Sequence, residues 1–96
     1  MRLTPFEIIS IKQTFSDLFG DGEVYLFGSR VDDLLRGGDI DLYLCPSQKF
    51  DDERRRKINF LIKLESLIGE QKIDVVMYKN KDRLIEKEAI NRGILL

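Results

Sequence analysis

The chain has 96 residues, of which 43% are hydrophobic and 34% charged, and this mixture predicts one globular domain over residues 1–96 and excludes a disordered chain. Sixteen basic residues stand against 17 acidic ones, so the chain lacks the basic excess of a general nucleic-acid-binding protein. No apolar run is long enough to span a membrane, Met1–Ser10 lacks the apolar core of a signal peptide, and Cys45 alone allows no intrachain disulfide, so we expect a cytoplasmic protein.

A helix and a short strand are predicted at the start of the chain. Thr4 can cap the helix, Pro5 fits its first position, and Glu7 can complete a capping box. Apolar residues then recur at helical spacing as far as Phe19, before a Gly-Asp-Gly stop. Residues 23–27 form a β-prone run that ends at a glycine, which predicts the first strand.

The next segment predicts a short helix and a second strand. Ser29 can cap a helix over residues 30–36, which two glycines end. Residues 39–45 alternate strictly, as in a half-buried strand. One face of this strand carries Ile40, Leu42 and Leu44, and the other carries Asp39, Asp41 and Tyr43.

The second half of the chain continues the alternation of helices and strands. It predicts a helix over 51–68, a strand over 72–78, a helix over 81–92 and a short final strand over 94–96. The apolar residues of the 51–68 helix cover roughly 220° of the helical wheel, more than one sheet face needs, so this helix is a candidate docking surface. The alternation predicts an α/β fold, in which helices pack on a small sheet.

One candidate binding motif is the turn Gly28-Ser29-Arg30, which follows a predicted strand and opens a predicted helix. The N-terminus of a helix offers unpaired N–H groups to an anion, and glycine lets the backbone approach a phosphate closely. Ser29 adds a hydroxyl group and Arg30 a positive charge. An ordinary strand-turn-helix connection is the alternative, because an isolated Gly-Ser motif is not specific.

Three aspartates form the second candidate site. Asp39 and Asp41 lie two apart on a predicted strand and therefore project from the same face. Asp74 is a single acid within an apolar strand and faces away from Ile73 and Val75. A solvent-exposed face is the alternative for each, but paired carboxylates repel one another, and a divalent cation would relieve that repulsion. Because the chain has no histidine, the expected metal is a hard cation with oxygen ligands, first of all Mg²⁺. Carboxylates on strands beside a phosphate-type turn favour metal-assisted phosphoryl or nucleotidyl transfer.

These motifs together resemble a known family. Gly28-Ser29, nine intervening residues, Asp39-x-Asp41 and a later strand with Asp74 are similar to the DNA polymerase beta-like nucleotidyltransferase superfamily. The segment from Phe27 to Leu42 resembles the minimal nucleotidyltransferases of bacteria and archaea. The resemblance implies an α+β fold with a small mixed sheet and helices packed on it.

The resemblance also implies roles for the site residues. Gly28, Ser29 and Arg30 would bind the triphosphate of ATP. Asp39 and Asp41 would hold two Mg²⁺ ions, and Asp74 would complete the metal site and help deprotonate the acceptor hydroxyl. The partner implied is a HEPN-domain toxin, to which the chain would transfer AMP on a tyrosine, thereby acting as an antitoxin. Because larger members carry a helical acceptor-binding domain, a partner chain is expected to supply that surface here.

Two other functions are compatible with the same residues. The chain could be an antitoxin that binds and masks its partner without catalysis, with the carboxylates left from an ancestral activity. It could also transfer a nucleotide to a small molecule of the antibiotic type. The sequence leaves open the nucleotide, the acceptor and whether the chain forms a homo-oligomer or a hetero-oligomer.

Overall fold

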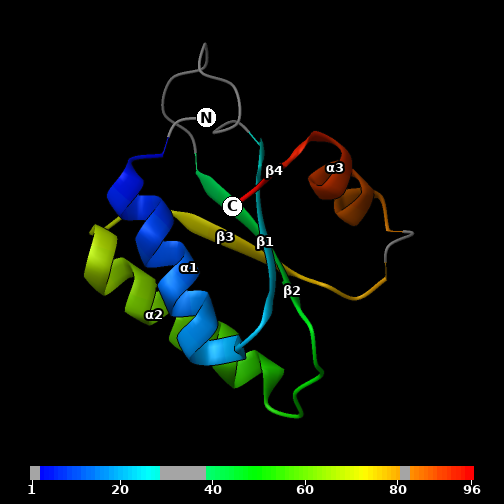
Figure 1. The fold of residues 1–96 in the computed structure, drawn as a ribbon, viewed down its shortest axis with the longest axis horizontal. Helices are drawn as coiled ribbons and strands as arrows, with labels where there is room; N and C mark the ends of the chain where they lie inside the picture. Colours follow the sequence, from blue (N-terminus) through cyan, green and yellow to red (C-terminus); the bar gives the residue numbers. More distant parts are fainter. Residues whose placement is uncertain (1–2, 29–38, 81–82) are drawn as a thin grey trace.

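The computed structural model describes residues 3–28, 39–80 and 83–96, and within them it has three helices and four strands (Figure 1). The predicted helix over 30–36 lies outside the described residues, as do Ser29 and Arg30. In chain order the elements are α1 (Pro5–Phe19), β1 (Gly22–Phe27), β2 (Ile40–Pro46), α2 (Glu53–Ile68), β3 (Ile73–Met77), α3 (Leu84–Arg92) and β4 (Ile94–Leu95). Each predicted element within the described residues is therefore present, with ends that move by one to three residues.

The four strands form one mixed sheet in the order β3-β2-β1-β4. β1 is antiparallel to β2 and to β4, whereas β2 and β3 are parallel. A parallel pair requires a crossover connection, and α2 supplies it. The register places Asp41 between Phe27 on β1 and Asp74 on β3. The predicted small mixed sheet with packed helices, an α+β fold, is confirmed.

The beginning of α1 shows how the local sequence defines an element. The Thr4 hydroxyl accepts a hydrogen bond from the Glu7 amide at 3.1 Å, and the Glu7 carboxylate accepts one from the Thr4 amide at 2.9 Å. This is the predicted capping box, with Pro5 at the first helical position. The helix ends at Gly20, which adopts a positive φ of 73°.

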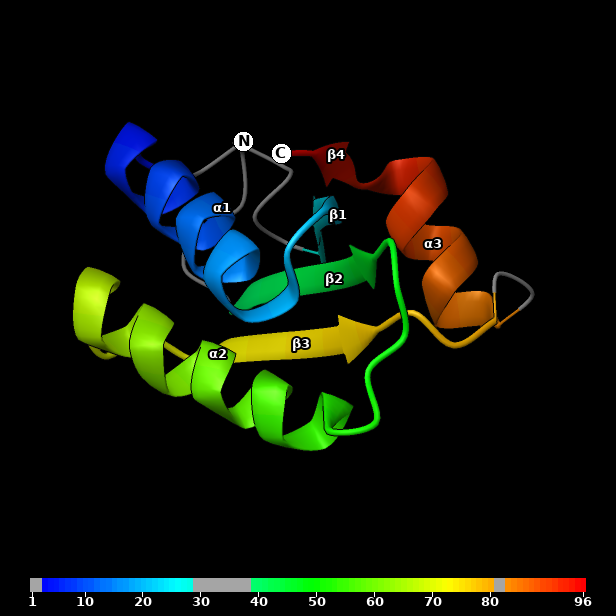
Figure 2. The same ribbon diagram turned by 60° about the horizontal axis from the view of Figure 1, so that its bottom comes forward.

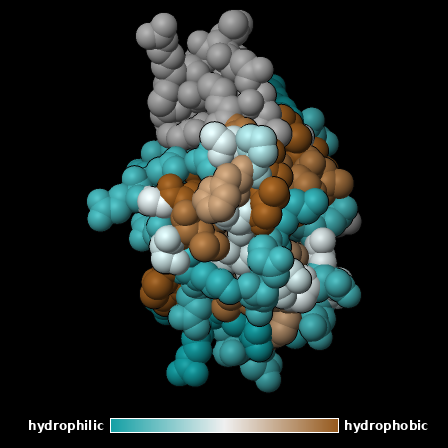
Figure 3. Space-filling view, turned by 60° about the vertical axis from the view of Figure 1, so that its left-hand side comes forward, coloured by the Kyte–Doolittle hydropathy of each residue, from teal (hydrophilic) through white to brown (hydrophobic). Residues whose placement is uncertain are grey.

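The main core lies between the sheet and the layer formed by α1 and α2 (Figure 2). Phe19 of α1 is fully buried, and its ring contacts those of Phe15, Phe50 and Phe60. The apolar face of β2, with Ile40, Leu42 and Leu44, is also fully buried against this layer. The outer surface of the α1–α2 layer mixes apolar and polar side chains (Figure 3), and Ile58 and Ile62 of α2 are 50% and 62% exposed.

The opposite face of the sheet is covered at one end by α3 (Figure 2). A smaller cluster forms there from Phe27, Tyr43 and Ala89. Tyr43 is fully buried, so the prediction of a half-buried strand is wrong at this position. The reason is that α3 covers the face that local alternation predicts to be in solvent. None of the helices described is long and apolar enough to cross a membrane.

Candidate functional site

The three predicted aspartates lie on the side of the sheet on which α3 packs, at the end that α3 does not cover. Ile40 and Leu42 pack into the core between the sheet and α1–α2, so Asp41, between them on β2, projects from the opposite face. Asp39 immediately precedes this strand. Asp74 lies between Ile73 and Val75, which also pack against the main core, and it pairs in register with Asp41. The parallel β2–β3 pair therefore places Asp41 and Asp74 side by side.

The electrostatics of this carboxylate pair are unfavourable without a counterion. The pKa of Asp41 is raised, first by burial and then by the negative charges of Asp74 and Asp39. Lys72 opposes this effect: its ammonium group lies 3.3 Å from a carboxylate oxygen of Asp39. The pKa of Lys72 is in turn raised, mainly by its hydrogen bond to Asp39. Among the described residues, the three carboxylates thus carry more negative charge than Lys72 balances.

Gly28, the residue that follows β1, lies beside the Asp41 carboxylate. It adopts a positive φ of 76°, and a Cβ atom built on it would lie 2.2 Å from Oδ2 of Asp41. No side chain fits there unless the carboxylate moves, so glycine is required both by the backbone conformation and by the space. The structure therefore places Asp41 of β2 between Asp74 of β3 and Gly28, the residue that follows β1. Ser29 and Arg30, the other two residues of the predicted phosphate-binding turn, lie outside the described residues.

The donor atoms at this site suit a hard divalent cation. Carboxylate oxygens are the ligands that Mg²⁺ prefers. Burial first, and then the charges of Asp74 and Asp39, raise the pKa of Asp41, and a cation would compensate the second of these effects. In the described part of the chain, no group of three or more acidic or cysteine side chains is gathered closely enough to hold a metal ion. Asp39 is instead paired with Lys72. Metal binding would therefore require Asp39 to exchange the lysine for the cation.

Lys72 is the site residue that the sequence analysis did not single out. It precedes Asp74 by two positions, which is the spacing of side chains on one face of a strand. That spacing was a usable signal for a cation beside the carboxylates. Its pairing with Asp39, however, depends on the β2–β3 register, which the local sequence does not give.

Comparison with known protein families shows to which family the chain belongs. A family model described as polymerase beta, nucleotidyltransferase matches residues 10–96. The chain belongs to this family. A search of curated proteins found no match. The matched range includes α1 from Ser10 onward, the whole sheet and all the candidate site residues, so the polymerase beta nucleotidyltransferase assignment rests on the part of the fold that builds the site. Membership of this family indicates nucleotide transfer as the class of activity.

Proposed function

We propose that the chain is a Mg²⁺-dependent nucleotidyltransferase that transfers AMP from ATP to a hydroxyl group, a tyrosine of a HEPN-domain toxin, and thereby acts as an antitoxin. The observation that carries the proposal is the register of Asp41 with Asp74, with Gly28 packed against Asp41, in a chain of the polymerase beta nucleotidyltransferase family. The HEPN partner and the antitoxin role come from the resemblance of the Phe27–Leu42 segment to minimal nucleotidyltransferases.

Each residue of the candidate site has a role in the proposed transfer. Asp39, Asp41 and Asp74 would hold two Mg²⁺ ions, which supply charge neutralisation for the triphosphate and the attacking oxygen. Gly28, with Ser29 and Arg30, would bind the triphosphate. Asp74 is exposed, unlike the partly buried Asp41, and can accept the proton of the acceptor hydroxyl. The hydroxyl oxygen then forms a bond to the α-phosphorus, and pyrophosphate leaves with the electron pair of the broken P–O bond.

The first prediction concerns ligand binding without a partner. Mg²⁺ or Mn²⁺ together with ATP should raise the melting temperature, because a ligand that binds only the folded state stabilises it by about 2.7 kcal/mol at a hundredfold excess over Kd. The double variant Asp39→Ala/Asp41→Ala should abolish the rise, measured by differential scanning fluorimetry. Asp51→Ala/Asp52→Ala is the matched control, because both residues are exposed and lie outside the site. A melting temperature indifferent to millimolar Mg-ATP would contradict an intact nucleotide site.

The second prediction distinguishes catalysis from masking. With the cognate HEPN protein, Mg²⁺ and ATP, the wild type should add the mass of AMP to the partner, as read by intact-protein mass spectrometry. Asp74→Asn retains the shape of the side chain but loses its charge, so transfer should fall by at least about a hundredfold while the complex still forms. The variant should then fail to protect cells from the toxin.

The opposite result has a definite meaning. If the partner mass does not change with wild type, and Asp74→Asn still protects cells, the chain is a masking antitoxin on a nucleotidyltransferase fold. Transfer to a small molecule in place of the partner would contradict the protein acceptor but leave the catalytic site intact.

A further inference from the structure

The edge strand β3 is paired on one side only among the described strands. The Lys72 carbonyl accepts from the Ile40 amide at 3.0 Å, and the Tyr78 amide donates to the Leu44 carbonyl at 2.9 Å, so these residues direct their backbone groups toward β2. Because backbone direction alternates along a strand, the intervening Val75 directs its N–H and C=O groups away from β2, toward the free edge. An edge of this kind is a template for another strand.

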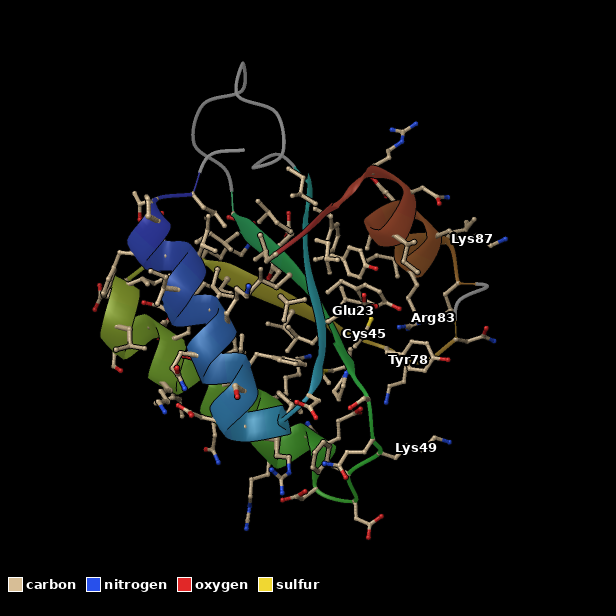
Figure 4. The ribbon with its side chains drawn as sticks, viewed as in Figure 1. Glu23, Cys45, Lys49, Tyr78, Arg83 and Lys87 are labelled. Atoms are coloured by element: carbon tan, nitrogen blue, oxygen red, sulfur yellow. The ribbon has the colours of Figure 1, made fainter. Side chains whose placement is uncertain are left out.

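A groove of about 470 Å³ runs along this free edge, between α2 and the beginning of α3. Val75 and Val76 line it from the strand, and Ile85, which is 42% exposed, lines it from α3. Arg83 closes one end: its guanidinium donates to the Met77 carbonyl at 3.1 Å, and Figure 4 shows the side chain reaching back from the start of α3. The groove thus combines an apolar wall with a strand edge that Arg83 occupies at the Met77 carbonyl and leaves open at Val75.

The charged residues of the groove are mostly basic. Arg54 and Lys57 line it from α2, and Lys79 and Arg83 line it from the segment that joins β3 to α3. Glu53 is the one acid among the described lining residues, and its carboxylate is paired with Lys79 at 2.9 Å. Arg83 is in turn paired with Glu86, so Arg54 and Lys57 give the described groove its positive charge, in a chain whose net charge is −1.

We propose that this groove binds an extended, acidic segment of a partner protein, which adds to the sheet along β3. Strand addition uses the outward N–H and C=O groups for affinity, while the basic rims select acidic side chains. A second copy of the chain would bring two basic rims together, which charge repulsion opposes. Single-stranded nucleic acid is disfavoured because no aromatic ring is among the described lining residues, and binding of that kind uses base stacking.

The docking site is distinct from the carboxylate site but adjoins it. Asp74 immediately precedes Val75 on β3, so a guest strand paired with Val75 passes beside the candidate catalytic residues. The docking does not require nucleotide transfer, and it is tested without metal or nucleotide. Its failure would therefore leave the proposed activity standing, and failure of the activity would leave the docking standing.

The test measures binding of a fluorescein-labelled peptide of about eight residues that alternates glutamate and valine, by fluorescence anisotropy, with a lysine–valine peptide as the comparison. The glutamate peptide should bind, with an affinity that falls as salt is added, and the lysine peptide should not. Arg54→Glu/Lys57→Glu should weaken binding by at least about tenfold. Arg55→Glu/Lys87→Glu makes the same charge change at exposed positions that do not line the groove, and it should bind nearly as wild type.

A second pair of variants tests strand addition itself. Val75→Pro removes the outward amide but leaves the bonds between β2 and β3, and an edge strand tolerates proline at such a position. Val75→Ala shortens the same side chain and keeps the amide. The proline variant should lose binding by at least about tenfold relative to the alanine variant, with both folded by circular dichroism.

Three kinds of result would overturn the proposal. The first is a failure in peptide binding, either equal binding by Val75→Pro and Val75→Ala or no binding of the glutamate peptide up to millimolar concentration. The second is tighter binding of single-stranded polyuridylate than of the glutamate peptide. The third is a dimer of the wild-type chain, seen by sedimentation, that Val75→Pro dissociates, because the edge would then be occupied by a second copy.

Discussion

At the scale of single residues, Gly28 carries the strictest requirement in the site. Its backbone adopts a positive φ, and the Asp41 carboxylate occupies the space where a Cβ atom would lie. The same carboxylate has a raised pKa, from burial and from its two acidic neighbours. The absence of a side chain at Gly28 thus leaves room for the Asp41 carboxylate beside the end of β1.

Substitution of Gly28 by alanine should disturb both the backbone and the site. We expect Gly28→Ala to lose about 1–3 kcal/mol of folding free energy and to abolish the thermal response to Mg-ATP, because Asp41 must move. Gly69→Ala is the control: Gly69 also has a positive φ, of 89°, but a Cβ there meets nothing within 4 Å. It should lose stability by strain alone and keep the response. A Gly28→Ala protein that still responds to Mg-ATP would show that this close approach is not needed.

At the scale of elements, α3 is attached to the sheet by the buried carboxylate of Glu86. This carboxylate accepts hydrogen bonds from the Tyr43 hydroxyl at 2.7 Å, from the Lys79 and Asn80 amides at 2.9 Å each, and from the Arg83 guanidinium at 2.5 Å. Burial alone would raise the pKa of Glu86, but these donors lower it to about 2. One side chain thereby joins β2, the segment after β3 and the first turn of α3.

Loss of the Glu86 charge should loosen this attachment. Glu86→Gln replaces the carboxylate, which only accepts hydrogen bonds, by an amide that places an NH₂ group among four donors. We expect the free energy of unfolding, measured with urea at neutral pH, to fall by about 2–4 kcal/mol. Because the folded pKa, about 2, is below the ordinary value of 4.5, the contribution of Glu86 is complete above the ordinary value and is lost as pH falls toward 2.

The difference in stability between wild type and Glu86→Gln should therefore narrow as the pH falls below about 4.5. Glu88→Gln, at an exposed position of the same helix, should change stability by less than about 0.5 kcal/mol. A gap between wild type and Glu86→Gln that stays constant as the pH falls would contradict the depressed pKa.

At the scale of the whole molecule, stability depends on the aromatic cluster between the helical layer and the sheet. Phe19 is fully buried, and its ring centroid lies 5.5 Å from that of Phe15, 5.9 Å from that of Phe50 and 6.3 Å from that of Phe60. These rings come from α1, from the segment before α2 and from α2 itself. A fold of this size has little excess stability, so one cluster can decide whether it folds.

The substitution Phe19→Ala should lower the free energy of unfolding by about 3–5 kcal/mol. It should also lower the midpoint of urea unfolding, monitored by circular dichroism. Phe6→Ala makes the same chemical change in the same helix, at a side chain that is 58% exposed, and should cost less than about 1 kcal/mol. Equal losses in the two variants would mean that helix propensity, and not the core, sets the stability of α1.

Local sequence patterns predicted most of the helices and strands. The features that they did not predict depend on contacts between residues far apart in the sequence. The capping box at Thr4 depends on neighbours in sequence and is present in the structure, whereas the alternation over 39–45 fails at Tyr43, which α3 buries. Glu86 reads as a solvent-facing acid in its helix, because its partners come from β2 and from the segment after β3. The predicted positions of Ser29 and Arg30 beside the carboxylates remain predictions.

The parallel pairing of β2 with β3 also has a consequence for the order of folding. Asp41 and Asp74 come into register only after the chain has closed the loop that contains α2. Closing such a loop costs chain entropy before any contact repays it. A chain in which β2 and β3 have not yet paired therefore presents Asp39 and Asp41 without Asp74 beside them. The metal site proposed above would therefore form only once β2 and β3 have paired.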